Sequence, residues 1–157
     1  IDFKGIDALG ICFPVHSWGI PSIVRDFIQS LPKDHKIPYI YMVCTCGDDI
    51  GLTMQEFESL LEKQNQKASL YYSVQMPNSY VNLPGFDVDP VELQRKKVNT
   101  TENQLKALSK IILERGTAVN VVKGSMPWLK SKVIRPFFYS FLVNDSFFHV
   151  ENSKAFL

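Results

Sequence analysis

The chain has 157 residues, of which 45% are hydrophobic and 21% charged, a composition that excludes wholesale disorder and allows one domain with a real core. The formal net charge of +1 excludes a general electrostatic attraction to nucleic acid. No stretch approaches the roughly 18 apolar residues of a membrane span, and no signal peptide opens the chain, so we expect a cytoplasmic protein without membrane insertion.

The cysteines support the same location. Cys12, Cys44 and Cys46 are an odd, sparse set, and the last two lie too close along one apolar segment for an ordinary disulfide. Free thiols in or near a core are typical of a reducing cytoplasm. These cysteines and His16 leave a zinc ion without a fourth ligand, so we expect no metal site.

The first predicted strand covers residues 8–15, ALGICFPV, because a run that is apolar without alternation is typical of a central parallel strand. A helix follows, and Pro32 ends it. Its predicted apolar face has offsets of helical period and consists of Ile20, Ile23, Val24, Phe27, Ile28 and Leu31.

A second buried strand is predicted at 39–45, YIYMVCT, and a third at 69–76, SLYYSVQM. Between them lies a helix for which Thr53 and Glu56 form a capping box in the sequence. The irregular stretch PNSYVNLPGFDVD after the third strand is long for a compact domain, which favours a functional role.

A further helix is predicted from Asp89, as its N-cap, to Gly116. Its predicted inner face consists of Val98, Thr101, Leu105, Leu108 and Ile112. A short extended piece, TAVNVV, leads to a last helix rich in aromatic residues, PWLKSKVIRPFFYSFLV, which we expect Pro136 to kink or break. Lys130, Lys132 and Arg135 interrupt its apolar run and exclude a membrane span.

Alternation of strands and helices predicts an α/β fold with parallel strands and helices on both faces of one sheet. Ligands of such sheets bind beyond the carboxyl ends of the strands. The segments PVHSWG, TCGDDIG and MPNSYVNLPGFD each follow a strand, so they must converge on one edge. Trp18 and Tyr80 offer flat apolar surfaces there, the glycines allow close approach, and the polar side chains include Asn78, so the set suits a planar heterocycle.

More ordinary interpretations of these residues stay open. Trp18 is equally well explained as a rim residue over the helix start, and His16 more often serves as a surface histidine than as a catalyst. Asp48 and Asp49 are typical turn residues and need not be a catalytic pair. The predicted cofactor-binding residues are Pro14, Val15, His16, Ser17, Trp18, Gly19, Thr45, Cys46, Gly47, Asp48, Asp49, Gly51, Asn78 and Tyr80.

Four segments resemble a known family in their order and spacing, and the resemblance covers nearly the whole chain. They are GICFPVHSWGIPSIVRDFI, YIYMVCTCGDDIG, MPNSYVNLPGFDVD and GSMPWLKSKVIRPFF. Together they resemble the flavodoxin-like domain of bacterial flavodoxin–ferredoxin fusion proteins. The resemblance implies a doubly wound, three-layer α/β/α fold of strand order 2-1-3-4-5, in which the three predicted strands are the third to fifth. It further implies flavin mononucleotide (FMN) as the cofactor and electron transfer as the activity.

By the same resemblance, the loop from Pro14 to Gly19 covers one face of the isoalloxazine, and Trp18 stacks on it. Residues 45–51 then meet the pyrimidine edge of the ring through backbone amides, and residues 76–80 lie at its periphery. The aspartates of the second loop are expected to lower the flavin potential through their negative charge.

The sequence departs from this family at both ends. The first strand and the Ser/Thr/Gly-rich phosphate loop and its helix are absent, so binding of FMN is expected only with a phosphate site that these residues do not supply. The carboxyl end carries no cysteine motif, which excludes an iron–sulfur cluster on this chain. We therefore predict a flavodoxin-like domain over 1–124, partial at its amino end, and an aromatic helix and tail over 125–157 that packs on it or on a partner.

The leading hypothesis is an FMN-binding electron-transfer module, with a ferredoxin-type iron–sulfur protein or domain as its partner. The alternatives are a flavodoxin-like interaction module that binds no flavin, or an FMN-dependent small-molecule reductase, so enzymatic activity stays open. Residues 1–88 hold 6 basic and 10 acidic side chains, and residues 89–157 hold 11 and 6, so the basic half could dock an acidic redox partner. Whether the chain forms a homodimer is also open.

Overall fold

A sheet of four parallel strands is the centre of the protein, whose computed structural model describes residues 3–78 and 87–141. The strands lie side by side in chain order: β1 (Ala8–Pro14), β2 (Tyr39–Cys46), β3 (Leu70–Gln75) and β4 (Ala118–Asn120). The prediction that the first three strands are parallel neighbours is confirmed. The extended piece that follows the long helix adds β4 to the sheet beside β3.

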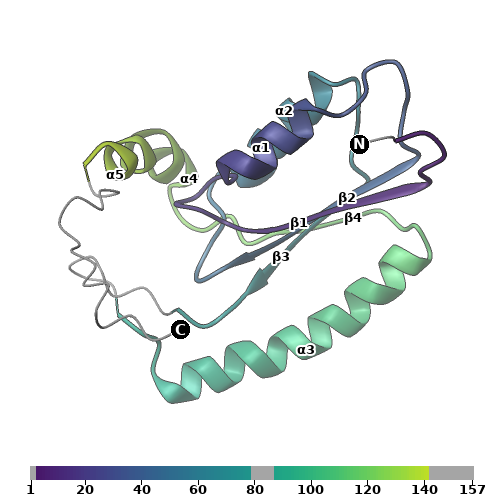
Figure 1. Cartoon of the computed structure of the whole chain (residues 1–157). Helices are drawn as coiled ribbons and strands as arrows, with labels where there is room; N and C mark the ends of the chain where they lie inside the picture. Colours follow the sequence, from purple (N-terminus) through teal and green to yellow (C-terminus); the bar gives the residue numbers. More distant parts are fainter. Residues whose placement is uncertain (1–2, 79–86, 142–157) are drawn as a thin grey trace, which may run out of the picture.

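Helices lie on both faces of this sheet. Figure 1 shows α1 (Ser22–Gln29) and α2 (Thr53–Glu62) on one face and α3 (Val91–Leu113) on the other. A C-terminal helical segment follows, made of α4 (Pro127–Leu129), the π-helical turn η1 (Lys130–Ile134) and α5 (Arg135–Phe141). It lies at the end of the sheet where β1 leads into α1 (Figure 1).

Alternating side chains of β2 enter two separate cores. Ile40, Met42 and Cys44 are fully buried and join Phe57 of α2 in the larger core. Tyr39 and its same-face neighbours join Leu108 of α3 in the smaller one. Successive side chains of a strand point to opposite faces, so a strand that is covered on both sides is apolar without alternation. This is the pattern from which the strand was predicted.

The predicted apolar faces of two helices are only partly buried. Ile23 of α1 is 76% exposed, and Val98 and Leu105 of α3 are about half exposed, so these three assignments are wrong. In α3 the buried positions are Thr101 and Leu108, seven residues apart on one stripe. Positions at the margin of such a stripe stay in solvent, because a helix covers only as much as the surface beneath it allows.

The predicted caps are also wrong, for a reason that matters to the site. Thr53 donates its hydroxyl hydrogen bond to the Ile50 carbonyl and caps no amide, and Glu56 is used in a tertiary contact described below. Asp89 does not cap α3, since its carboxylate accepts from the Asn78 N–H and pairs with Lys97. In both cases a tertiary partner competes successfully with the local cap.

The predicted break at Pro136 does not occur, because α5 runs through this residue, and a π-helical turn lies directly before it. Proline has no N–H, and its ring clashes with the carbonyl four residues earlier, that of Lys132. Widening the preceding turn to π-helical spacing relieves this clash without ending the helix.

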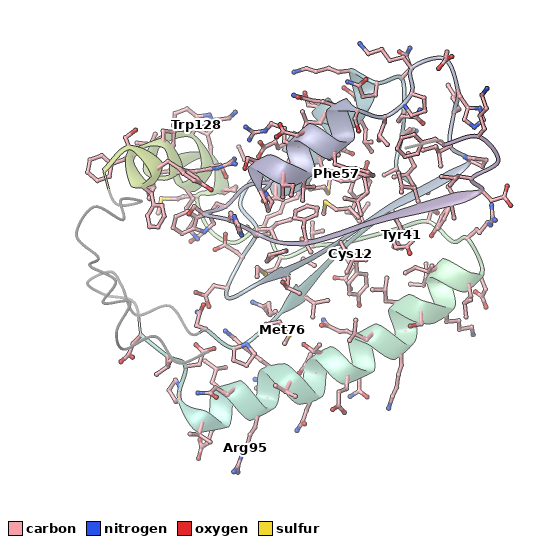
Figure 2. All side chains as sticks on the ribbon, viewed as in Figure 1. Cys12, Tyr41, Phe57, Met76, Arg95 and Trp128 are labelled. Carbon is pink, nitrogen blue, oxygen red and sulfur yellow. The ribbon has the colours of Figure 1, made fainter. Side chains whose placement is uncertain are left out.

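A further prediction is that the C-terminal aromatic helix packs on the domain or on a partner. Trp128 lies on the outer side of the segment (Figure 2) and is 63% exposed, and Phe137 is also exposed. The side chain of Phe141 and the tail from 142 onward lie outside the described residues, so the packing predicted for 125–157 stays a prediction. No helix of the described chain is long and apolar enough to cross a bilayer.

Candidate functional site

The loop after β1 forms a tight turn with an unusual backbone. His16 and Gly19 exchange two backbone hydrogen bonds of 3.0 and 3.1 Å around Ser17 and Trp18. Both central residues have positive φ, 46° and 57°, a conformation for which such turns normally recruit asparagine and glycine. Left-handed backbone at a bulky residue costs on the order of 1–2 kcal/mol. A half-buried indole is therefore placed at this edge against its local preference.

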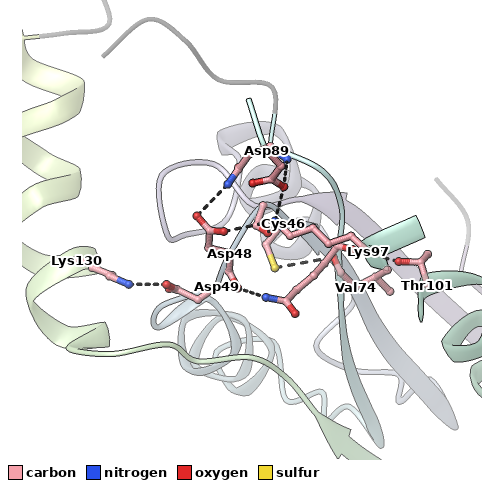
Figure 3. A network of polar contacts seen from close by, with 11 residues as sticks. Cys46, Asp48, Asp49, Val74, Asp89, Lys97, Thr101 and Lys130 are labelled. Carbon is pink, nitrogen blue, oxygen red and sulfur yellow. Dashed lines mark hydrogen bonds and ion pairs between the residues drawn. The ribbon is translucent and has the colours of Figure 1, made fainter. Parts of the chain in front are cut away.

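The loop after β2 is held by contacts from three directions. The Ile50 N–H donates to the Val122 carbonyl at 2.9 Å, and the Gly51 N–H donates to the Asp49 carboxylate at 3.1 Å. The other oxygen of Asp49, a residue only 9% exposed, pairs with the Lys130 ammonium of the C-terminal segment. Figure 3 shows this ion pair beside the exposed Asp48. Asp49 is therefore a buried carboxylate whose negative charge is balanced by the Lys130 ammonium.

Ser131 joins the first two loops. Its hydroxyl donates to the Trp18 carbonyl at 2.8 Å and accepts from the Leu52 N–H at 2.9 Å. Gly51 has φ of +54°, and a Cβ built on it would lie 2.8 Å from the Trp18 Cβ and 2.5 Å from the Ser131 oxygen. Only glycine allows this close approach. The Lys130 ammonium lies 5.9 Å from the centre of the Trp18 ring, within cation–π range.

The loop after β3 meets the second loop through Asn78. Its side-chain amide donates to the Asp48 carboxylate at 2.9 Å, and its oxygen takes the space that a side chain on Gly47 would need. Lys97 of α3 donates to the Gly47 carbonyl at 2.8 Å and pairs with Asp89 at 2.7 Å (Figure 3). Hydrogen bonds from Lys97 and then from the Asn78 N–H hold the pKa of Asp89 below its usual range.

The predicted site residues thus fall into two contacting groups and a remainder. Trp18 lies with Asp49 and Gly51, while Asn78 lies with Gly47 and Asp48. The outcome for the others varies by residue. Pro14, His16 and Thr45 are exposed, Ser17 is half-buried, and Val15, Gly19 and Cys46 pack inward. Tyr80 lies outside the described residues.

Cys46 belongs to the core more than to the site. Burial, together with the carboxylates of Asp49 and Asp48, raises the pKa of its thiol to about 11. Burial, with a smaller effect of Cys46, raises that of Cys44 to about 12. Both thiols are therefore protonated and unreactive at neutral pH. Any ligand contact from position 46 would have to come from the backbone.

Glu56 anchors the C-terminal segment to α1 and α2. Its carboxylate accepts from Arg135 at 2.7 Å, from the Ile20 N–H at 3.2 Å and from Arg25. Burial alone would raise the pKa of Glu56, but the hydrogen bonds from Arg135, Ile20 and Arg25 outweigh it and hold the pKa below its usual range. Arg135 also donates to the Ile20 carbonyl at 3.0 Å.

Sequence reasoning missed Lys97, Lys130, Ser131 and Arg135 as site residues. Lys130 and Arg135 were noted as charged residues within an aromatic helix, but their spacing did not indicate that both contact the loop edge. Residues five apart point about 140° from each other on an α-helix of 3.6 residues per turn. The π-helical turn between them, whose hydrogen bonds span five residues, brings both side chains to the loop edge.

Comparison with known proteins returns nothing: no protein-family model, curated protein or solved structure matches this chain. Over residues 3–78 and 87–141, no group of three or more His, Cys, Asp and Glu side chains is arranged to hold a metal ion.

Proposed function

We propose that the edge formed by the three loops binds the isoalloxazine ring of FMN and that the protein is an electron-transfer module. The single observation that carries this proposal is the turn at Ser17 and Trp18, which holds a bulky aromatic residue in a left-handed conformation. Strain of this kind is concentrated at ligand-binding and active sites. The proposal is also supported by the position of the three loops, which meet at the carboxyl ends of parallel strands.

The residues present fit the ring of the cofactor but not its phosphate. Trp18 supplies an aromatic surface, and the N–H groups of Asp48 and Asp49 donate to no other described residue, so they are available to the pyrimidine edge. Asn78 adds a side-chain amide beside them. No Ser/Thr/Gly-rich phosphate loop occurs among these residues, so in this proposal they supply the ring contacts, and the phosphate of FMN needs a site beyond them.

FMN, when bound, accepts and releases one or two electrons. The role of the chain is to hold the ring against Trp18 and to set the charge around it. We now expect only Asp48, and not Asp49, to lower the flavin potential, because Lys130 balances the charge of Asp49. Lys97 lies 3.5 Å from the Asp48 carboxylate and weakens that effect as well.

The finer architecture belongs to the same proposal. Four parallel strands with helices on both faces are compatible with a flavodoxin-like, three-layer fold in which β1 to β3 are the third to fifth strands. We include a ferredoxin-type electron-transfer partner and a cytoplasmic location in the proposal. An experimental structure of the complete gene product would test the layers and strand order directly.

The decisive experiment is titration of the protein with FMN and with riboflavin, followed by flavin fluorescence and visible absorbance. Trp18→Ala is expected to weaken binding by about 1–3 kcal/mol, or roughly 5- to 150-fold in Kd, the scale of one aromatic stacking contact. His16→Ala is the matched control within the same turn and is expected to change Kd by less than about 3-fold, because His16 is exposed.

Each result has a clear meaning. Binding of riboflavin that depends on Trp18 supports the ring site independently of any phosphate contact. A complete gene product that takes up neither flavin would refute the proposal and leave the interaction-module alternative.

A further inference from the structure

A recess with a volume of about 860 Å³ lies among α1, α2 and the C-terminal helical segment. This volume is within the range of small-molecule sites. Its walls include Ser22, Arg25 and Gln29 of α1, which form one stripe of that helix. Along α2 and its two cap residues the wall extends from Leu52 to Lys63, roughly 16 Å at 1.5 Å per residue. Apart from His16, none of the predicted flavin-binding residues lines it.

The recess has a strong positive charge compared with the protein as a whole. Its wall contains four Lys or Arg side chains and one carboxylate, Glu56. The whole chain has 17 basic and 16 acidic residues, so composition alone would give a nearly neutral wall. The four basic residues are Arg25 of α1, Lys63 at the end of α2, Lys132 of η1 and Arg135 of α5. An anion in the recess would meet converging positive charge.

The cations nearest Glu56 are held in place before any ligand arrives. Glu56 bonds to Arg25 and Arg135, so the two guanidinium groups flank one carboxylate. Arg135 is fixed further by the Ile20 carbonyl, and its side chain is only 15% exposed. Arg25 keeps most of its five N–H donors for other partners, and Lys132 forms no hydrogen bond or ion pair with a described residue. Guanidinium groups in fixed positions are suited to phosphate oxygens.

A separate observation also indicates a ligand. The side-chain oxygen of Gln55, a wall residue, is buried and accepts no hydrogen bond within the described chain. An unsatisfied buried acceptor costs free energy, about 1–3 kcal/mol, and such groups are rare in native proteins. Rotation of this side chain toward the recess would let a ligand hydroxyl or amino group give the amide a partner.

We propose that the recess binds a small phosphate ester, whose phosphate contacts Arg25 and Lys132 and whose organic part carries a hydrogen-bond donor toward Gln55. Lys63 marks the far end of the recess, about 10 Å along α2 from Glu56, where a second polar group of the ligand would lie. This proposal does not depend on the flavin site, since the ring contacts proposed above come from Trp18 and from the loops after β2 and β3.

The test uses pyrophosphate as the probe and the chain as it exists, at constant ionic strength maintained with sodium chloride. Amide chemical shifts followed by ¹H–¹⁵N NMR are expected to saturate, with the largest changes at Ser22, Gln55 and Ser131. Lys132→Gln is expected to raise the Kd about tenfold, the effect of one charge-assisted contact. Lys132 is exposed and unpaired among the described residues, so this variant is expected to fold.

Lys106→Gln is the matched control, because Lys106 is equally exposed but belongs to α3 on the opposite face of the sheet. It is expected to leave the Kd within about twofold of the parent. Equal weakening by the two variants would show a general effect of net charge and overturn the site. Shifts that rise linearly without saturation would overturn it too. Saturation by hexaglutamate but not by pyrophosphate would replace the small molecule with an acidic protein segment.

Discussion

Replacing Glu56 with glutamine tests how the C-terminal segment is attached to the rest of the protein. The variant keeps the shape of the side chain but removes the charge that Arg135, Arg25 and the Ile20 N–H share. Only one oxygen is left for three donors, and the new NH₂ group faces guanidinium N–H groups that cannot accept from it.

The size of the effect follows from the exposure of the partners. A hydrogen bond to a charged group contributes about 1.5–3 kcal/mol when shielded from water. The Arg135 contact is close to that limit, since the side chains are 15% and 24% exposed. The Arg25 contact is weaker because that side chain is 38% exposed, and it adds less than about 1 kcal/mol. A glutamine oxygen in the place of Oε2 still accepts from Arg135 and from the Ile20 N–H, but as a neutral acceptor, so we expect a loss of about 2 kcal/mol in the free energy of unfolding.

Urea unfolding followed by circular dichroism measures this loss, and its pH dependence tests the cause. The pKa of Glu56 is lowered in the folded state, so its stabilisation is fully present above the ordinary glutamate pKa of about 4.3 and is lost as pH falls through the folded value. The difference between parent and variant should therefore be constant from pH 7 to about 5 and shrink below about 4.3.

Glu102→Gln is the control, because Glu102 is exposed on α3 and is expected to change stability by less than about 0.5 kcal/mol. The argument fails if Glu56→Gln matches this control at pH 7. It fails equally if the difference between parent and variant is unchanged at pH 3.

Two further predictions concern the site and the core. Ser131→Ala should lower the free energy of unfolding by about 1–3 kcal/mol, since it leaves the Leu52 N–H without its acceptor, whereas Ser140→Ala on exposed α5 should have almost no effect in the same urea titration. Iodoacetamide at pH 8 should modify exposed Cys12 well before Cys44, whose pKa of about 12 leaves almost no thiolate, and peptide mass spectrometry would show the order; faster labelling of Cys44 in the folded protein would contradict its burial.

The sheet could be predicted from the sequence because its strands obey one simple rule. Residues 39–46 are apolar on both faces, and this pattern indicates a covered parallel strand before any partner is known. Convergence of the loops then followed from the parallel arrangement alone. It was harder to predict which residues at the edge of a helix's apolar face are buried. Val98 has the spacing of an inner-face residue, but it lies beyond the surface that α3 covers and is exposed.

The candidate site could be predicted only in part, because competition between partners is not visible in a local pattern. Glu56 has the spacing of a capping box, yet two arginines distant in the sequence bind it in preference to the helix amide. The left-handed backbone of Trp18 contradicts its local preference and could not be predicted from residue type. Contacts of Lys130 depend on a π-helical turn, which the sequence indicated only as a disturbance at Pro136.

That turn decides which deletions the C-terminal segment tolerates. A π-helical turn contains one residue more than the α-helical turn that would replace it. Deleting exposed Val133 would therefore leave Lys130 and Arg135 four residues apart on a regular α-helix, only about 40° from each other. Such a shortened segment could still form both the Lys130 pair with Asp49 and the Arg135 pair with Glu56. With all residues present, a regular α-helix would point the two side chains about 140° apart and could keep only one of the two pairs.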